Sequence, residues 1–310
     1  MYRLCFYGLV FFLTAVVARR LNPAKQVLNE RGCGKVHASR RIIGGAEALE
    51  GQFPWAVYLE ISFPAGATRC GGSIVTRYHV VTAAHCTLYA GSGPGEVTVR
   101  YGNTDFKKGK PIKVERYLRH QKFVPSTFEN DIAIMQLKKP FTFDKKHAVP
   151  VCIPSHPVDV FHVPVAVAGW GVTSMKAEGL MKPTADTLQY TLVKVVPNSV
   201  CSAAFRDAGF HKELMYCAYR VNADACQGDS GGPMVARTRQ GKFLQVGIVS
   251  YGIGCAMNDM PGVYTRLDHY YNWIKHHLRR PRSMKLLKGL DPQSFYGLLR
   301  TLANTSDEEK

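Results

Sequence analysis

The ten residues 224–233, Asp-Ala-Cys-Gln-Gly-Asp-Ser-Gly-Gly-Pro, carry the side chain best suited to act as a nucleophile. Glycine adopts backbone conformations that other residues avoid, so the glycines around Ser230 predict a tight turn that other backbone can approach closely. Such a turn can present the Ser230 hydroxyl in a cleft and aim backbone N–H groups at the same point. Taken alone, the stretch also fits a solvated surface turn.

Two further stretches supply the groups that a serine nucleophile needs. His85 follows the small residues at 81–84, and Asp131 precedes the apolar stretch 132–134. An imidazole can take the proton from a serine hydroxyl, and a carboxylate can orient that imidazole. A single histidine or aspartate is usually structural. However, the chain order His, Asp, Ser matches one known class of catalytic triad and differs from two others.

These three motifs resemble those of the chymotrypsin-like serine proteases, and of their trypsin-like branch in particular. The resemblance covers residues 42–278. It implies a serine endopeptidase in which Ser230 attacks the peptide carbonyl and His85 acts as general base and then as acid. In this interpretation Asp131 holds the imidazole, and the backbone N–H groups of Gly228 and Ser230 form the oxyanion hole.

The resemblance also implies a primary specificity pocket with the carboxylate of Asp224 at its base. A buried carboxylate needs a cationic partner, which an arginine or lysine of the substrate would supply. Ala225 has no hydroxyl to solvate a lysine ammonium, whereas arginine can pair bidentately with a carboxylate without that help. We therefore expect cleavage after arginine, and less readily after lysine. The implied substrate-binding residues are Asp224, Ala225, Gln227, Ser250, Tyr251, Gly252 and Gly262, with Phe128 at the next subsite. Ser250 would also lie behind the triad aspartate, Asp131.

Short stretches rich in β-branched and aromatic residues, separated by glycine and proline, predict an all-β fold. Within the stretch that resembles the family, a helical pattern appears only at residues 268–278, which we expect to form a C-terminal helix. The resemblance implies two six-stranded antiparallel β-barrels with the site between them. His85 and Asp131 would come from the first barrel and Ser230 from the second. The expected strands are 53–59, 72–75, 96–101, 112–117, 132–137, 163–168, 188–195 and 243–250.

The N-terminus predicts a leader followed by a pro-segment. A basic start, an apolar run at 9–17 and a small residue at 18 are typical of a signal peptide over residues 1–18, and hence of secretion. This run is too short for a membrane span, and no later stretch is long enough for one. We assign residues 19–41 as the pro-segment and 42–278 as the peptidase domain.

The pro-segment ends in a basic cleavage site. Residues 39–41 are Ser-Arg-Arg, so a trypsin-like enzyme could cut after Arg41. The resemblance implies that the new N-terminus, Ile42, then folds inward and pairs with the carboxylate of Asp229. Because breaking such a buried ion pair is costly, the uncut chain would be a zymogen.

The chain has nine cysteines, and eight remain once the leader with Cys5 is removed. An even count in a secreted chain predicts four disulfides, although about a hundred pairings are possible. No C-x-x-C pair supports a metal site instead. The resemblance implies the pairs Cys33–Cys152, Cys70–Cys86, Cys201–Cys217 and Cys226–Cys255. The first would retain the cut pro-segment as a light chain, as in cascade and processing proteases.

Composition and charge limit the partners. The chain is 46% hydrophobic and 20% charged, which is ordinary for a globular protein, and its formal net charge is +17. Beyond residue 41 the balance is still +10. A basic surface suggests a polyanion such as a sulfated polysaccharide, although a soluble basic surface without such a partner is equally ordinary. We expect a monomer with protein substrates, an activating protease and protein inhibitors, and no nucleic-acid partner.

We expect no cofactor and no metal. Residues 103–111 occupy the place where many trypsins bind calcium through carboxylates, but lysines replace the acids here. Calcium needs several oxygen ligands, usually including carboxylates.

The resemblance stops at residue 278, and residues 279–310 form a separate tail. Five basic residues between 279 and 288 precede Asp291-Pro292, a helix-start signal. Apolar residues at 295, 298, 299 and 302 then share one helical face, and Asn304 is a glycosylation acceptor. This amphipathic tail either docks on a partner or an anionic surface, or remains solvated.

Two other functions remain open. A catalytically silent binding homologue would usually have lost a triad residue or the activation site, and this chain keeps both. A basic protein whose main role is to bind anionic polymers would be retained on heparin at raised salt.

Overall fold

The computed structural model describes residues 26–36, 46–89, 93–171, 185–206, 209–220, 229–252 and 261–278. The chain divides into two units, Val27–His277 and a unit made of Met1–Gln26 with Leu278–Lys310. The helices and strands described below all belong to the first unit.

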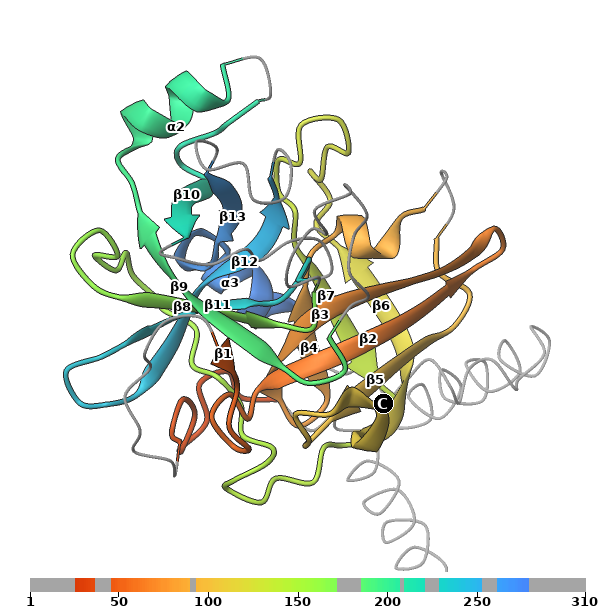
Figure 1. Cartoon of the computed structure of the whole chain (residues 1–310). Helices are drawn as coiled ribbons and strands as arrows, with labels where there is room; N and C mark the ends of the chain where they lie inside the picture. Colours follow the sequence, from red (N-terminus) through yellow and green to blue (C-terminus); the bar gives the residue numbers. More distant parts are fainter. Residues whose placement is uncertain are drawn as a thin grey trace, which may run out of the picture. The chain divides into compact units, whose positions relative to one another are not determined.

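Six strands of the first half close into a barrel (Figure 1). Their order around the barrel is β2 (Ala56–Phe63), β3 (Gly66–Thr76), β4 (His79–Thr82), β7 (Ala133–Leu137), β6 (Lys110–Arg119) and β5 (Val97–Tyr101). Side chains of a strand alternate between its two faces, so a barrel needs an apolar residue at every second position. β5 meets this need: Val97, Val99 and Tyr101 are buried, and the two residues between them are partly exposed.

A second ring of six strands follows in the second half. The sheet runs β1 (Ala46–Glu47), β9 (Gln189–Val195), β10 (Met215–Arg220), β13 (Gly262–Arg266), β12 (Phe243–Tyr251), β11 (Pro233–Arg237) and β8 (Val165–Gly169). A further pairing of β8 with β9 closes the ring, and β1 is added at the edge of β9. Its core is a cluster that includes Val165, Val167, Val193 and Val246.

The expected architecture is confirmed. All pairs between the named strands are antiparallel. Each of the eight predicted strands overlaps an observed one. Sequence patterns missed β1, β4, β10, β11 and β13, which are short or begin with glycine or proline.

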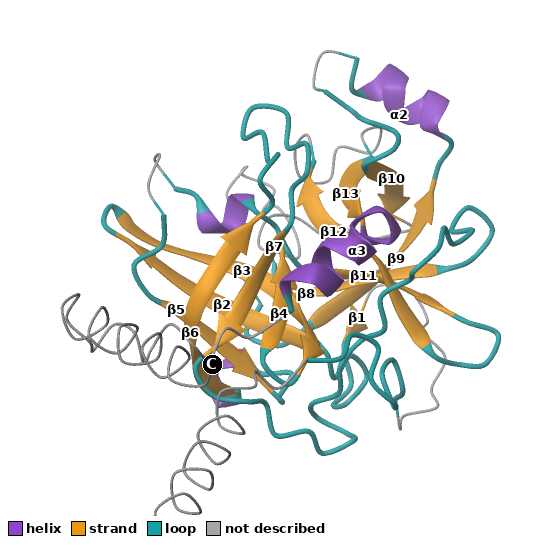
Figure 2. Ribbon diagram, turned by 180° about the vertical axis from the view of Figure 1, so that it is seen from behind, coloured by secondary structure: helices purple, strands orange, loops and turns teal. Residues whose placement is uncertain are grey.

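The predicted C-terminal helix is present as α3 (Leu267–His277). It buries Leu267, Tyr270 and Ile274, whose spacing of three and four residues places them on one face. Figure 2 shows α3 from the side on which it lies over β12. The other helical segments are α2 (Asn198–Ala204) and the 3₁₀ turns η1 (His85–Thr87) and η2 (Phe106–Lys108).

Aromatic side chains join the two barrels. The ring of Trp55 lies 5.3 Å from that of Phe243, and the ring of Tyr58 lies 5.7 Å from that of Trp170. Trp170 also donates a hydrogen bond of 2.7 Å from Nε1 to the carbonyl oxygen of Thr104. These contacts fix the first barrel against the second, and therefore fix the residues that each contributes to a shared site.

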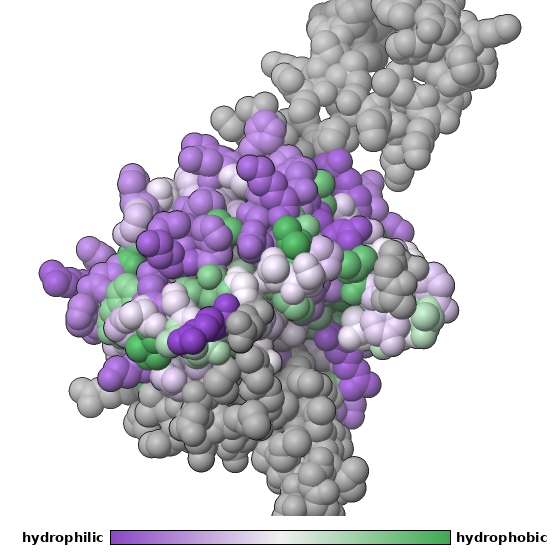
Figure 3. Space-filling view, turned by 90° about the horizontal axis from the view of Figure 1, so that it is seen from above, coloured by the Kyte–Doolittle hydropathy of each residue, from purple (hydrophilic) through white to green (hydrophobic). Residues whose placement is uncertain are grey.

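Hydrophilic residues cover most of the described surface seen in Figure 3, with small separate hydrophobic patches between them. The exposed large hydrophobic side chains are scattered along the described chain, at Val27, Leu49, Tyr89, Leu118, Val124, Phe161 and Val200. Scattered exposure of this kind is normal for a globular protein. None of the described helices has the length and apolar character needed to cross a membrane.

Candidate active site

His85 begins the 3₁₀ turn η1, three residues after β4 ends. The Cys70–Cys86 disulfide ties this turn to β3, and the side chain of Thr87 closes it with a hydrogen bond of 2.8 Å to the carbonyl oxygen of Ala84. Ala84 is fully buried, so a larger side chain would not fit beneath the turn. The imidazole of His85 itself is mostly buried, with 23% of its side chain exposed.

Asp131 lies two residues before β7, and its side chain is fully buried. Its Oδ1 accepts a hydrogen bond of 2.9 Å from the backbone N–H of His85. Its Oδ2 lies 2.8 Å from Nδ1 of His85 and accepts a bond of 2.6 Å from Oγ of Ser250. A buried ionised carboxylate requires such donors. Because the carboxylate can only accept, Nδ1 carries the proton and Nε2 is left to act as an acceptor.

The same contact sets the basicity of the imidazole. Burial by itself lowers the pKa of His85, but the charge of Asp131 and its hydrogen bond outweigh burial, so the pKa lies above the ordinary value. The charged imidazolium is therefore stabilised. This is the property that a general base needs after it has taken up a proton.

Ser230 lies in the glycine-rich turn that precedes β11. Its carbonyl oxygen accepts a hydrogen bond of 2.7 Å from the N–H of Gly71 in β3, which holds the turn against the first barrel. Gly231 has a φ of 79°, and a Cβ there would collide with the Thr82 hydroxyl and the Gly71 carbonyl. The glycine is therefore required by both its conformation and this close approach.

The serine turn and the histidine meet at the disulfide. Sγ of Cys86 lies 3.7 Å from the carbonyl oxygen of Ser230 and 3.8 Å from Nε2 of His85. The structure thus brings together the three predicted triad residues, with His85 and Asp131 bonded directly. The described hydrogen bonds of Ser230 use its backbone, and none joins its hydroxyl to His85. Such a bond often tightens only when substrate binds.

Backbone donors also surround Ser230. The N–H groups of Gly231 and Gly232 are bonded at 2.8 Å to the carbonyl oxygens of Val249 and Asp229. Among the described residues, the N–H of Ser230 has no such acceptor. The second predicted oxyanion donor, Gly228, lies outside the described residues.

Comparison with known proteins agrees with this arrangement. Residues 42–274 match the Trypsin family. The chain belongs to this family. It is 36% identical over 251 residues to the serine protease filzig of Drosophila melanogaster. The aligned region is 76% of this chain but only 14% of filzig. It is 34% identical over 279 residues to the clotting factor G beta subunit of Tachypleus tridentatus, covering 84% and 86% of the two chains. Trypsin Blo t 3 of Blomia tropicalis is 34% identical over 272 residues, with coverage of 86% and 96%.

The walls of the predicted specificity pocket of this trypsin-family chain are partly described. Gly252 follows β12, Gly262 begins β13, and a Cβ on Gly252 would lie 3.7 Å from the Cα of Gly262. A side chain on Gly252 would therefore approach the backbone of Gly262, whereas a Cβ on Gly262 would lie 3.3 Å from the hydroxyl of Tyr264. Three predicted pocket residues, Asp224, Ala225 and Gln227, lie outside the described residues. They follow β10, whose Ala218 is paired with Gly262.

Aromatic rings line one side of the histidine. The ring of Phe128 lies 5.5 Å from that of His85 and 5.1 Å from that of Tyr251. Phe205, just after α2, adds a ring 5.7 Å from that of Tyr251. Phe128 and Tyr251 were both expected near substrate, but Phe205 was not, since nothing in its local sequence links it to the motifs.

The predicted partner of the activation N-terminus is buried. Asp229 is 8% exposed, and its Oδ1 accepts a hydrogen bond of 2.9 Å from the N–H of Gly171. A Cβ on Gly169 would collide with this carboxylate, so the glycine makes room for it. Arg41 and Ile42 lie outside the described residues.

Three of the four implied disulfides are present, namely Cys33–Cys152, Cys70–Cys86 and Cys201–Cys217. Cys226 and Cys255 lie outside the described residues. Residues 26–36, the described part of the predicted pro-segment, are docked by more than the disulfide. Asn29 exchanges two hydrogen bonds with the backbone of Ile153, at 2.7 and 2.8 Å. Gly34 bonds to the backbone of Pro150 and Phe243, both at 2.8 Å.

In the loop at residues 103–111, for which we expected no calcium site, two lysines form ion pairs with carboxylates. Nζ of Lys107 lies 2.6 Å from Oδ2 of Asp186, and Nζ of Lys108 lies 3.3 Å from Oδ2 of Asp105. The first of these ion pairs joins the first barrel to the stretch before β9. Within the described part of the chain, the only grouping of three metal-ligating side chains is Cys70, His85 and Cys86. Its two cysteines are bonded to each other in a disulfide and so are not metal ligands.

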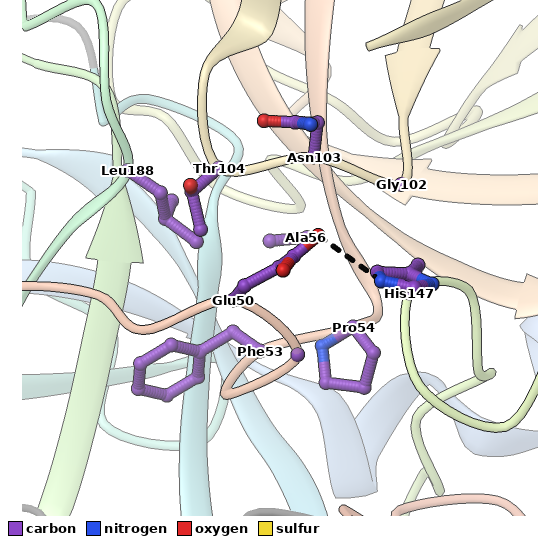
Figure 4. A pocket seen from close by; sticks show the side chains of 10 residues that line it. Glu50, Phe53, Pro54, Ala56, Gly102, Asn103, Thr104, His147 and Leu188 are labelled. Carbon is purple, nitrogen blue, oxygen red and sulfur yellow. Dashed lines mark ion pairs between the residues drawn. The ribbon is translucent and has the colours of Figure 1, made fainter. Parts of the chain in front are cut away.

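A small pocket lies away from the triad, where the chain passes from β1 to β2 (Figure 4). Glu50 points across it toward His147, whose Nε2 lies 3.0 Å from Oε1 of Glu50 and whose Nδ1 lies 2.8 Å from Oδ2 of Asp144. Nζ of Lys146 lies 3.4 Å from the same glutamate. The polar groups are thus paired with one another, and we assign no ligand to the pocket.

Sequence patterns missed the residues that support Asp131 from other elements. Thr265 of β13 donates a hydrogen bond of 2.9 Å to the carbonyl oxygen of Asp131. Tyr270 of α3 donates one of 3.0 Å to Oδ1 of Asn130. Asn130 is part of the motif that carries the aspartate, but its partner is 140 residues away and has no local signal.

Proposed function

We propose that this protein is a secreted serine endopeptidase that cleaves after arginine, and less readily after lysine, once it has been cut after Arg41. The observation that carries the proposal is the buried carboxylate of Asp131, bonded to Nδ1 of His85 beside the glycine-rich Ser230 turn. This arrangement provides a base of fixed tautomer next to a serine in a tight turn.

In the proposed reaction His85 takes the proton of the Ser230 hydroxyl as the oxygen attacks the peptide carbonyl carbon. The N–H groups of Ser230 and Gly228 stabilise the oxyanion of the tetrahedral intermediate. His85 then gives its proton to the leaving amine, and the C–N bond breaks to leave an acyl-enzyme. Water then takes the place of the amine: His85 removes a proton from the water as its oxygen attacks the acyl carbon. The ester bond to Ser230 breaks, the acid product leaves, and His85 returns the proton to the Ser230 oxygen. Asp131 stays ionised and stabilises the imidazolium throughout.

The chemistry is tested with an organophosphonate that carries an arginine-like group. Protein cut after Arg41 should be labelled at Ser230, and Ser230→Ala should fold, bind an arginine-type inhibitor and lose nearly all turnover. Correctly cut wild-type protein that takes no label would instead indicate a catalytically silent homologue.

Specificity is assigned to Asp224 at the base of the pocket, with Ala225 favouring arginine over lysine. Gly252 and Gly262 support this assignment, since neither has a side chain that would narrow the predicted pocket. The test compares kcat/KM for matched arginine and lysine substrates in the wild type and in Asp224→Ser. A wild type that cleaves both equally would contradict the role of Ala225. A strong basic preference in Asp224→Ser would contradict the pocket itself.

Activation is proposed to proceed through a new N-terminus at Ile42 that pairs with Asp229. Burial of Asp229 supports this proposal, because a buried carboxylate attracts an ammonium group more strongly than an exposed one does. The bonds of Asn29, Cys33 and Gly34 would retain the cut pro-segment as a light chain. A tethered light chain favours a role in a protease cascade. We further propose that the enzyme is a monomer, with an activating protease and a protein inhibitor as its partners.

A sulfated polysaccharide is the further partner that we propose. Burial, and then the positive charges of His276 and Arg116, lower the pKa of His277. Basic groups of β6 and α3 therefore lie close together, at the end of the helix that precedes the basic tail 279–288. Arg116→Ala and deletion of residues 283–310 should each lower the salt concentration that elutes the protein from heparin. The control is Lys139→Ala, which also removes one exposed cation. A loss in Lys139→Ala equal to that in Arg116→Ala would indicate only general charge attraction.

A further inference from the structure

The turn before Asp131 has an unusual backbone. Phe128 has a φ of 57° and Asn130 has a φ of 56°, both in the left-handed region. Residues other than glycine seldom adopt this region; asparagine tolerates it, whereas a bulky residue such as phenylalanine does so only under constraint. Two such residues among the three that precede the aspartate must therefore be held by their surroundings.

Asn130 is held at every polar atom of its side chain. It is 9% exposed, and its Nδ2 donates a hydrogen bond of 2.8 Å to the carbonyl oxygen of Lys122. Its Oδ1 accepts the bond of 3.0 Å from the hydroxyl of Tyr270. Its own carbonyl oxygen accepts a bond of 2.8 Å from the N–H of Ile132, which spans the aspartate. The side chain of Asn130 thus links the loop after β6 to α3, and its backbone carbonyl is bonded to the residue just before β7.

Tyr270 is a well-fixed donor. It is 1% exposed, and its ring packs edge-on against that of His120, with 5.3 Å between the ring centres. Burial, followed by the negative charges of Asp131 and Glu129, raises the pKa of Tyr270, so the hydroxyl keeps its proton. Because the amide nitrogen of Asn130 is used by Lys122, the amide oxygen is the group that faces this hydroxyl.

Both ends of the turn contact the histidine. At one end the carboxylate of Asp131 accepts two hydrogen bonds from His85, and at the other the ring of Phe128 packs against the imidazole. A change in the backbone of Asn130 would therefore move two groups that define the position of His85.

We propose that the Tyr270–Asn130 hydrogen bond positions Asp131 against His85 by holding the turn at residues 128–130 in its left-handed conformation. This inference rests on the proposed function, since it gives both residues a positioning role in that reaction.

The first test is Tyr270→Phe in the full chain, activated after Arg41 and counted by organophosphonate titration. The substitution removes the hydroxyl and keeps the ring packing on His120. Loss of one such bond should lower kcat about three- to tenfold, with KM within about twofold. A loosened Asp131 should also raise the pKa of His85 less, so the acid limb of kcat/KM should move to lower pH by a few tenths of a unit. A merely structural role would not shift that limb.

Two variants of Asn130 distinguish the effect of the backbone conformation on kcat from the effect of the hydrogen bond. Asn130→Gly loses the bond to Tyr270 but adopts the left-handed conformation freely, and Asn130→Ala loses the bond and resists that conformation. We expect kcat to fall in the order wild type, glycine variant, alanine variant, with the alanine variant more than about tenfold below the wild type. If Tyr270→Phe does not fold, the glycine variant provides the same test.

The matched control is Tyr101→Phe. Tyr101 is 5% exposed, and its hydroxyl accepts a hydrogen bond of 3.3 Å from the N–H of Thr142. The control variant therefore also removes the hydroxyl of a buried tyrosine. This variant should keep the wild-type kcat and acid limb even if its Tm falls. Variants at 270 and 130 that take the label but match the wild type in kcat and pH profile would overturn the inference. A wild type that takes no label would overturn the proposed function instead.

Discussion

Ser250 in β12 donates a hydrogen bond of 2.6 Å from Oγ to Oδ2 of Asp131, which belongs to the first barrel. The bond crosses the interface between the barrels and ends on a fully buried charge. Hydrogen bonds to charged groups contribute more than neutral ones, about 1.5–3 kcal/mol against about 0.5–1.5 kcal/mol.

Ser250→Ala should therefore lower the free energy of unfolding by about 1.5–3 kcal/mol, because it leaves one oxygen of the buried carboxylate with a donor fewer. The measurement is urea unfolding in the Ser230→Ala background, which prevents self-digestion. The matched control is Ser73→Ala, since Ser73 is also fully buried but its Oγ lies 3.4 Å from a neutral acceptor, the carbonyl oxygen of Val81. Equal losses in both variants would show that the charge of Asp131 adds nothing.

Asp144 should make stability depend on pH in the acid range. Burial raises the pKa of Asp144. Hydrogen bonds from the backbone and side chain of His147 and from the N–H groups of Ala148 and Lys146 outweigh burial and lower the pKa to about 2. A carboxylate with a depressed pKa stabilises the fold above its unfolded pKa, near 4, and this contribution is lost as pH falls toward 2. Because its side chain is 35% exposed, solvent screening leaves about 1–2 kcal/mol at neutral pH.

Asp144→Ala should thus be less stable than the wild type at pH 7, and the difference should shrink between pH 4 and pH 2. Asp159→Ala is the control, since Asp159 pairs with His162 at the same spacing but is 63% exposed. Urea unfolding of both variants at several pH values provides the measurement. A difference for Asp144→Ala that stays constant down to pH 2 would contradict the assignment.

The loop 103–110 should need no calcium. Its ion pairs, Lys107–Asp186 and Lys108–Asp105, already supply positive charge to the carboxylates near it. A ligand present at 100 times its Kd would add about 2.7 kcal/mol and raise Tm by several degrees. We expect Tm to be the same in EDTA and in millimolar calcium, as measured by thermal unfolding of the Ser230→Ala variant. A clear rise with calcium would show that the loop binds the ion despite its lysines.

Cleavage after Arg41 should control activity. Loss of the Ile42–Asp229 ion pair, at about 3–5 kcal/mol, corresponds to a several-hundredfold or larger loss of the active form. Arg41→Gln should therefore remain nearly inactive after treatment with a trypsin-like activator, while wild type gains turnover on a peptidyl-arginine substrate. Full activity of the uncut variant would refute the mechanism.

The same cleavage should leave two chains joined by a disulfide. On a non-reducing gel the activated wild type should keep its pro-segment, and a reducing gel should release it. Cys33→Ser should release the segment without reduction, because the remaining bonds of Asn29 and Gly34 do not survive denaturation. A pro-segment lost from the wild type on a non-reducing gel would show that Cys33 does not tether it.

Local sequence was sufficient for elements whose apolar residues repeat clearly. β5, with its strict alternation, and α3, with apolar residues every three or four positions, lie within a residue or two of their predicted bounds. β4 has only four residues, β10 has no clear alternation of apolar and polar residues, and β13 begins with glycine. These strands escaped prediction because they gain their stability from their neighbours in the barrel and have little local preference.

The types and order of the residues determined the candidate chemistry: a serine among glycines, a histidine beside a cysteine, and an aspartate before an apolar strand. The family resemblance placed Ser250 behind Asp131, but the sequence could not determine the other residues that hold these three in place. Thr265 and Tyr270 support the Asp131 segment through hydrogen bonds that span more than 100 residues. Contacts of this kind depend on the closure and mutual packing of two barrels. No local pattern records them, and only the tertiary structure decides which distant side chain becomes the donor.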